Sequence, residues 1–211
     1  MNERVTVSPA FFFSDSEPAP KKELYRVAYQ RNSYADNAFL QFSKQQKNLR
    51  VSYTHSFQSA CEDVYNGVCD FCILPVENAA EGQLNSVSRL IKQFDLKIAA
   101  SCSIGNDPLR STRFALLRKQ LTPLLNLGNE VFLEFSIPLF STPSISELLF
   151  AAELCGLRLH RFDTLPDIDE PNRFSVHILL QTEKADLCAY LLYLAMEAPH
   201  YNPIGIYSHI S

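Results

Sequence analysis

The segment 70–76, DFCILPV, constrains the fold of this chain more than any other stretch. It is a continuous apolar run bounded by Gly67 and Glu77, a pattern typical of a parallel strand that is covered on both faces. Parallel neighbours need long crossover connections, because a tight hairpin reverses the chain direction. The sequence around this run therefore has to supply helices as well as further strands.

Helical and strand patterns do alternate around this run. Strands are expected over 27–30, 49–53, 96–104 and 112–119, and helices over 34–44, from Ser56 to Gly67 and from Leu84 onward. This order predicts a mostly parallel sheet with crossover helices. The segment 105–111, GNDPLRS, is expected to turn the chain into the last of these strands.

The pattern of apolar and polar residues changes beyond residue 120. Residues 131–138 alternate as a half-buried strand, and Thr142 as N-cap, Pro143 at the first helical position and Gly156 beyond the end frame a helix. The elements expected after this helix are strands over 157–166 and 173–181, a helix capped by Thr182, and a closing strand over 203–210. The order β-α-β-β-α-β is the split ferredoxin-like arrangement.

The predicted fold class is therefore α/β, with one mostly parallel α/β lobe followed by a ferredoxin-like βαββαβ module. Residues 1–24 are polar and proline-bearing and are expected to form a flexible leader. The lobe is assigned to 25–120 and the second module to 129–211.

Composition and charge argue against several classes of function. The net charge of −4, with scattered lysines and arginines, provides no basic surface for nucleic acid. The longest apolar runs, such as 10–13 and 187–196, fall short of the ~20 residues of a membrane span. The N-terminus lacks the layout of a secretory signal, and we expect a cytoplasmic protein.

The six cysteines all lie inside apolar helix or strand patterns and are predicted to be buried free thiols. Cys69 and Cys72 have the spacing of a metal knuckle, but no second pair completes four ligands. Neither a metal nor a cofactor is expected.

The polar residues after the 70–76 run form a candidate binding site. Glu77 and Asn78 come directly after the strand, at the carboxyl end where open α/β sheets bind ligands and helix N-termini present N–H groups to anions. A polar loop after a strand is also common in any such sheet. Asn78 can equally serve only to hold the turn through its own side-chain hydrogen bonds.

Four segments in this order resemble prephenate dehydratase with its C-terminal ACT regulatory domain. They are VAYQ (27–30), LPVENAAEGQLN (74–85), LKIAASCSI (96–104) and STRF (111–114). The family patterns read like YQG, PIENS and N.TRF. The resemblance implies a lyase that converts prephenate to phenylpyruvate with loss of carbon dioxide and water, on a lobe that is half of a periplasmic-binding-protein-like two-lobe domain.

By this resemblance, Thr112 would assist the departing hydroxyl, Arg113 would pair with a substrate carboxylate, and Phe114 would fix both by packing. Arginine suits a carboxylate because its planar fork makes two parallel charge-assisted bonds. Thr112 and Arg113 can also be an ordinary strand-edge pair. The residues that would line the substrate cleft are Glu77, Asn78, Gln30 and Ser111.

The chain departs from the family in its catalytic part. The family has a whole second lobe between the strand at 96–104 and the TRF segment, where this chain has only GNDPLR. Residues 31–34 also replace a glycine-bearing turn that lets backbone N–H groups approach an anion. The resemblance therefore implies a truncated catalytic domain with reduced or lost activity.

The ACT part departs as well. The family motif Glu-Ser-Arg-Pro becomes DTLP at 163–166, and the helix opens with PSI at 143–145. The residues that match the effector site are Ser144, Ile145, Asp163 and Thr164. The arginine of this family motif is missing here, which weakens phenylalanine sensing of the usual kind. Expected partners are prephenate or an aromatic amino acid and a second copy of the chain; the alternative is a non-catalytic ACT-type regulatory or interaction protein.

Overall fold

The computed structural model describes residues 22–105, 107–121, 130–166, 173–183, 187–198 and 200–210. The chain divides into two compact units. The first unit joins Lys22–Phe132 to the C-terminal segment Pro203–Ser211, and the second unit contains Leu133–Asn202. Nearly all of the predicted leader, 1–24, lies outside the described residues.

The first unit is built on a mixed sheet with the strand order β2-β1-β3-β6-β5-β10. Its strands are β1 (Tyr25–Gln30), β2 (Leu49–Thr54), β3 (Phe71–Asn78), β4 (Gly82–Gln83), β5 (Lys97–Ile104), β6 (Thr112–Arg118), β10 (Asn202–Tyr207) and β11 (His209–Ile210). β1 is parallel to β2 and β3, but β6 is antiparallel to both of its neighbours, β3 and β5. The prediction of a mostly parallel sheet is wrong at β6, because the connection 105–111 is too short for a crossover.

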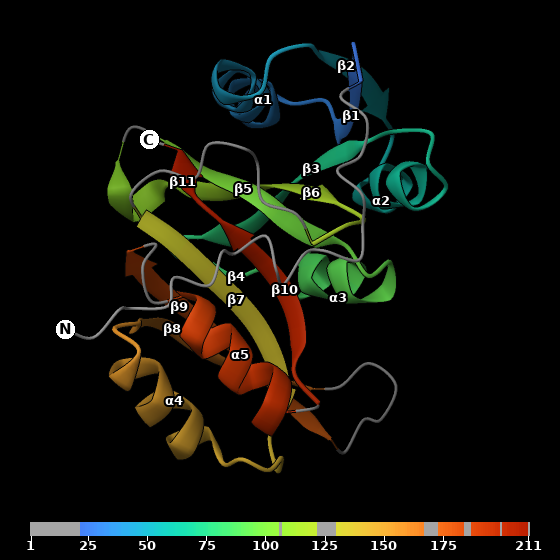
Figure 1. Cartoon of the computed structure of the whole chain (residues 1–211). Helices are drawn as coiled ribbons and strands as arrows, with labels where there is room; N and C mark the ends of the chain where they lie inside the picture. Colours follow the sequence, from blue (N-terminus) through green and yellow to red (C-terminus); the bar gives the residue numbers. More distant parts are fainter. Residues whose placement is uncertain are drawn as a thin grey trace, which may run out of the picture. The chain divides into compact units, whose positions relative to one another are not determined.

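Helices cover both faces of this sheet (Figure 1). They are α1 (Ser33–Gln45), α2 (Phe57–Tyr65) and α3 (Asn85–Gln93), with a short 3-10 turn at Pro108–Arg110. α1 buries Ala38 and Phe42 in a cluster with Val27, Ile73 and Phe114. α2 packs against β1 and β3. Burying these apolar faces holds the helices to the sheet.

The ends of α2 are as predicted. Ser56 Oγ accepts a hydrogen bond from the Ser59 amide at 3.0 Å, which satisfies one unpaired donor at the helix start. Gly67 follows the last residues of the helix with φ +74°, a left-handed conformation that favours glycine.

The second unit contains the remaining elements. They are β7 (Glu130–Pro138), which begins in the first unit, α4 (Ile145–Leu154), β8 (Arg158–Pro166), β9 (Phe174–Glu183) and α5 (Leu187–Glu197). Its strands neighbour one another in the order β7-β9-β8, with β8 at the edge, and β8 is antiparallel to β9. The order β7-α4-β8-β9-α5-β10 has the predicted sequence of element types.

The core of the second unit lies between its strands and α5. Leu133, Phe135 and Ile178 are fully buried, and the Phe135 ring lies 6.3 Å from the buried ring of Tyr190. The Tyr190 hydroxyl donates to the Leu148 carbonyl at 3.2 Å. This bond joins α5 to α4 and satisfies a polar atom that burial would otherwise leave without a partner.

Two predicted helix caps are wrong. α4 begins at Ile145 and its N-cap is Ser144, not Thr142. The Ser144 amide donates to Glu147 at 2.7 Å and Ser144 Oγ accepts from the Glu147 amide at 3.4 Å, a capping box that fixes the start beyond Pro143. The bonds that the Ser144 amide and hydroxyl donate to the Glu147 carboxylate hold the pKa of Glu147 below its usual value. Thr182 lies buried within β9, so it does not cap α5.

The six cysteines are free and five of them are buried, which confirms the prediction for those five; Cys155 is only half-buried. Within the described ranges, no helix has both the length and the apolar character that crossing a membrane requires.

Candidate functional site

The antiparallel pairing of β3 with β6 brings the two sequence motifs together. Glu77 lies opposite Arg113 and Asn78 lies opposite Thr112. The register shifts between Pro75 and Glu77, where proline offers no N–H to the ladder and a β-bulge is tolerated. Glu77 and Asn78 therefore belong to the end of β3, and not to a turn as predicted. Chain segments far apart in sequence meet here because β6 lies between β3 and β5 and pairs with both.

The Asn78 side chain has two contacts. Its Oδ1 accepts from the Ala80 amide at 2.9 Å, which holds the turn into β4, and its Nδ2 donates to Thr112 Oγ1 at 3.4 Å. The Ala79 amide donates to the Ser111 carbonyl at 2.9 Å, which ties the same turn to the start of β6. The structure confirms that Asn78 holds the turn, and its amide also reaches Thr112. A contact of Asn78 with a substrate stays a prediction.

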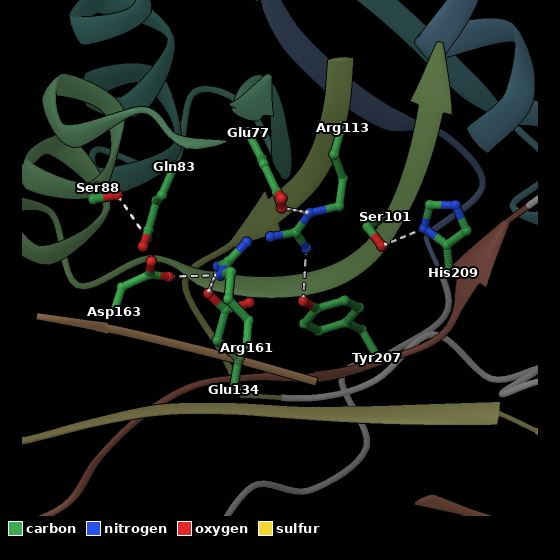
Figure 2. A network of polar contacts seen from close by, with 10 residues as sticks. All are labelled: Glu77, Gln83, Ser88, Ser101, Arg113, Glu134, Arg161, Asp163, Tyr207 and His209. Atoms are coloured by element: carbon green, nitrogen blue, oxygen red, sulfur yellow. Dashed lines mark hydrogen bonds and ion pairs between the residues drawn. The ribbon is translucent and has the colours of Figure 1, made fainter. Parts of the chain in front are cut away.

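Arg113 is held from two sides (Figure 2). Its Nε donates to Glu77 Oε2 at 2.9 Å, and its Nη1 donates to the hydroxyl of Tyr207 at 2.9 Å. The Arg113 side chain is 14% exposed and the Glu77 side chain 30%. A carboxylate of the same chain thus compensates the guanidinium charge. The two charges attract strongly because the ion pair is largely withdrawn from water.

Phe114 points away from Arg113, since successive side chains on a strand face opposite sides of the sheet. It is 3% exposed and packs into the α1 cluster with Phe42 and Ile73. Phe114 thus anchors β6 in the core.

The C-terminal strand contributes the residues that sequence reasoning missed. Tyr207 is fully buried and its ring stacks on Phe132 at 5.9 Å. His209 lies opposite Ser101 on β5, and its Nδ1 is 3.0 Å from Ser101 Oγ (Figure 2). The 203–210 segment was predicted as a strand, but no local pattern identifies the neighbour of a strand. Gly205 is the one available signal, because glycine within a strand often marks a close backbone approach.

The side chains gathered here are of kinds that bind anions in other proteins. Arg113 is a cation, and Asn78 and Thr112 add a side-chain amide and a hydroxyl beside it, the kind of groups that bind carboxylates. The nearby Cys102 is fully buried, and burial raises its pKa to about 12, so the thiol stays protonated at neutral pH. Among the residues that the structure describes, no group of three or more metal-ligating side chains is found.

Of the remaining predicted substrate residues, one lies beside β6 and the other does not. Ser111 directly precedes β6 and its carbonyl takes part in the turn contact described above. Gln30 ends β1, whose neighbours in the sheet are β2 and β3, so β3 separates it from β6. The structure brings Glu77, Asn78, Ser111, Thr112 and Arg113 together, whereas Gln30 lies on β1, one strand away from β6.

The predicted effector residues of the second unit have internal contacts. Ser144 is engaged in the capping box, and Ile145 is the first residue of α4. Asp163 Oδ2 lies 2.7 Å from Arg161 Nε, and Arg161 Nη2 lies 3.5 Å from the buried Glu134 (Figure 2). Thr164 is exposed on β8. Ser144 and Asp163 thus make the contacts of a folded helix start and a local ion pair.

Comparison with known families identifies part of the chain. Residues 27–105 match the family model of prephenate dehydratase, which confirms the predicted resemblance over that segment. The match ends where β5 gives way to the short connection to β6. A search of curated proteins finds no match.

Solved structures share the fold over most of the chain. A prephenate dehydratase from Streptococcus mutans aligns with a TM-score of 0.68 at 18% identity, covering 89% of this chain and 100% of that one. GqqA, described as a novel type of quorum quenching acylase, aligns with a TM-score of 0.65 at 16% identity, covering 87% and 94%. A prephenate dehydratase from Arthrobacter aurescens in complex with L-Phe aligns with a TM-score of 0.64 at 13% identity, covering 87% and 90%.

Proposed function

We propose, from the prephenate dehydratase segment at residues 27–105, that the first unit keeps a carboxylate-binding half-site and that its turnover of prephenate is reduced or lost. The observation that carries this proposal is the pairing of Glu77 and Asn78 with Arg113 and Thr112 across β3 and β6. In this proposal Arg113 binds a substrate carboxylate and Thr112 assists the departing hydroxyl. Asn78 orients the Thr112 hydroxyl through the contact between their side chains.

Two features support reduced or lost turnover. The segment 105–111 takes the place where the resemblance implies a second lobe, and dehydration with loss of carbon dioxide needs a site that excludes water. Glu77 also neutralises Arg113 within the chain, so a substrate carboxylate has to compete with a carboxylate that is already in place. Residual activity would need a second wall from another subunit.

The chain is expected to bind prephenate and to form phenylpyruvate slowly or not at all. Binding is measured as a rise in melting temperature with added prephenate, because a ligand that binds only the folded state stabilises it. Phenylpyruvate formation is followed by its ultraviolet absorbance. If turnover is measurable, Thr112→Ala should reduce kcat about 100-fold or more, as loss of a proton donor does, while the melting-temperature shift persists.

Ser103→Ala is the matched control for Thr112→Ala, because Ser103 is an exposed hydroxyl-bearing residue opposite Arg113 on β5. It should leave both the shift and the rate near those of the parent chain. A wild-type rate typical of an efficient enzyme would contradict the proposed loss of activity, and the absence of any shift with prephenate would contradict the half-site itself.

A second candidate function is a non-catalytic ACT-type regulatory or interaction protein that forms a homodimer through the second unit. β8 is the edge strand of that unit, and edge strands present unpaired backbone groups that favour pairing with another chain. Large apolar side chains are exposed on β8 and α4: Leu159, Phe162, Phe150 and Leu154. These residues support an interface for a second copy.

The dimer hypothesis predicts a mass near twice that of the chain in gel filtration with light scattering. Phe162→Glu should convert the dimer to a monomer, because two like charges would then face each other near the two-fold axis of an edge-to-edge pairing. Leu109→Glu is the control, since Leu109 is 78% exposed in the first unit. A monomeric parent chain would contradict this candidate.

Binding of an aromatic amino acid belongs to the same candidate function, because one structural neighbour is a complex with L-Phe. The internal contacts of Ser144 and Asp163 argue for a weak site. The proposed cellular setting is the cytosol, which agrees with six free cysteines in a reducing compartment.

A further inference from the structure

We propose that Tyr207 is a positioning residue for Arg113. The C-terminal segment Pro203–Ile210 thereby contributes to carboxylate binding. This inference rests on the proposed role of Arg113 as a carboxylate partner. The observation behind it is the bond from Arg113 Nη1 to the Tyr207 hydroxyl at 2.9 Å, between residues 94 positions apart in the sequence.

The C-terminal segment is held to β5 at several points. Lys97 Nζ donates to the Pro203 carbonyl at 2.9 Å, near the start of the segment. The Ser101 amide donates to the Ser208 carbonyl at 3.2 Å, and Ser101 Oγ lies 3.0 Å from His209 Nδ1. These contacts lie before and after Tyr207 in the chain, so its backbone position is fixed from both sides.

The Tyr207 side chain is fixed as well. The residue has no measurable exposure, and its ring stacks on Phe132 with an angle of 23° between the ring planes. Two residues earlier, Gly205 lies opposite Ile98, so close that a side chain there would meet β5. The hydroxyl is therefore placed by packing, which makes it a rigid hydrogen-bond acceptor for a long and flexible arginine.

The two bonds to Arg113 use different nitrogens. Glu77 accepts from Nε, and Tyr207 accepts from Nη1. Two anchors on different nitrogens restrict the orientation of a planar guanidinium more than the Glu77 contact does without Tyr207. Carboxylate recognition by arginine depends on this orientation, because the fork donates along fixed directions. Loss of the Tyr207 hydroxyl should therefore weaken carboxylate binding without changing the charge of the site.

The test compares Tyr207→Phe with Tyr190→Phe in the full-length chain. Both tyrosines are fully buried, and each hydroxyl has one hydrogen bond described above, so the control removes a similar bond in the second unit. With prephenate as the probe in titration calorimetry, Tyr207→Phe should raise Kd about tenfold, as expected for loss of a bond to a charged group. Tyr190→Phe should leave Kd unchanged.

A double-mutant cycle separates positioning from general stability. In an Arg113→Lys background, Tyr207→Phe should cause no further rise in Kd, because lysine has no fork for the hydroxyl to orient. A ligand-independent measurement is the exchange with water of the Arg113 Nε proton, observed by nitrogen-15 NMR and assigned by its absence from Arg113→Lys. This exchange should become about tenfold faster in Tyr207→Phe, as loss of one anchor frees the guanidinium.

The outcomes distinguish the two proposals. The proposed function fails if Arg113→Lys leaves prephenate binding intact, or if the parent chain does not bind prephenate. In either case the proton exchange of Arg113 alone decides whether Tyr207 positions the guanidinium. If Arg113→Lys weakens binding but Tyr207→Phe changes neither Kd nor exchange, only the positioning role is overturned. Equal effects of Tyr207→Phe and Tyr190→Phe on Kd would also overturn it.

Discussion

The Arg113→Ala variant is expected to lose the melting-temperature shift with prephenate and to unfold more easily than the parent chain. The substitution removes the cation that the proposed half-site offers to a carboxylate. It also leaves the half-buried Glu77 without the arginine contact seen in the structure, at a cost of about 2 kcal/mol in the free energy of unfolding. Thermal melting with and without prephenate measures both effects.

Arg110→Ala provides the control for charge. Arg110 is exposed just before β6, and its loss changes the net charge by the same amount. It should alter neither stability beyond about 0.5 kcal/mol nor the response to prephenate. A prephenate shift that survives in Arg113→Ala would remove Arg113 from the site, and Asn78 and Thr112 would have to bind the ligand by themselves.

The Gly205→Ala variant is expected to destabilise the first unit by about 3 kcal/mol, because the added methyl group overpacks a tight strand contact. A Cβ at position 205 would lie 2.8 Å from both Cβ and the carbonyl oxygen of Ile98, and 2.9 Å from Cδ1 of Tyr207. The Ile98 carbonyl is part of the β5 backbone, so the C-terminal strand has to move away. Chemical denaturation measures the loss in free energy of unfolding.

Gly67→Ala separates this packing effect from the conformational freedom of glycine. Gly67 has φ +74° and nothing within 4 Å of an added Cβ, so its substitution should cost only about 1 kcal/mol of backbone strain. Equal losses in the two variants would contradict the close approach of β10 to β5. Gly205→Ala should also weaken prephenate binding, since moving the strand moves the Tyr207 hydroxyl away from Arg113.

The proposed site combines residues from three distant segments of the chain. β3 supplies Glu77 and Asn78, β6 supplies Thr112 and Arg113, and β10 supplies Tyr207. The last contribution follows from the grouping of Pro203–Ser211 with the first unit. The proposed half-site therefore includes a residue of β10 as well as Glu77 and Asn78 from the segment that matches the family.

Particular elements show what sequence reasoning could predict. The continuous apolar run at 70–76 and the Ser56 and Gly67 signals gave the correct types of β3 and α2, because burial on two faces and helix capping are local properties. Thr142 and Thr182 gave wrong caps. α4 begins after Ser144 because the reciprocal bonds between Ser144 and Glu147 outweigh the weaker preference for proline at the first helical position. Thr182 caps no helix because β9 continues through it.

The candidate site was partly predictable. The motifs containing Glu77, Asn78, Thr112 and Arg113 were identified from their order in the sequence, and the structure brings these four residues together. The sequence did not identify Glu77 as the ion-pair partner of Arg113, and it did not place Tyr207 beside Arg113. Both depend on which strands become neighbours, and neighbouring strands are chosen by the burial of whole faces and by connection lengths.

The sequence by itself determined the types of most elements, the burial of the cysteines and the residues with the chemistry to bind an anion, because periodicity, capping and side-chain chemistry act over a few residues. Tertiary structure alone decided that β6 runs antiparallel between β3 and β5, and that the C-terminal strand lies beside β5 with Tyr207 against Arg113. Those choices depend on pairing energies between segments up to about a hundred residues apart, which no local pattern encodes.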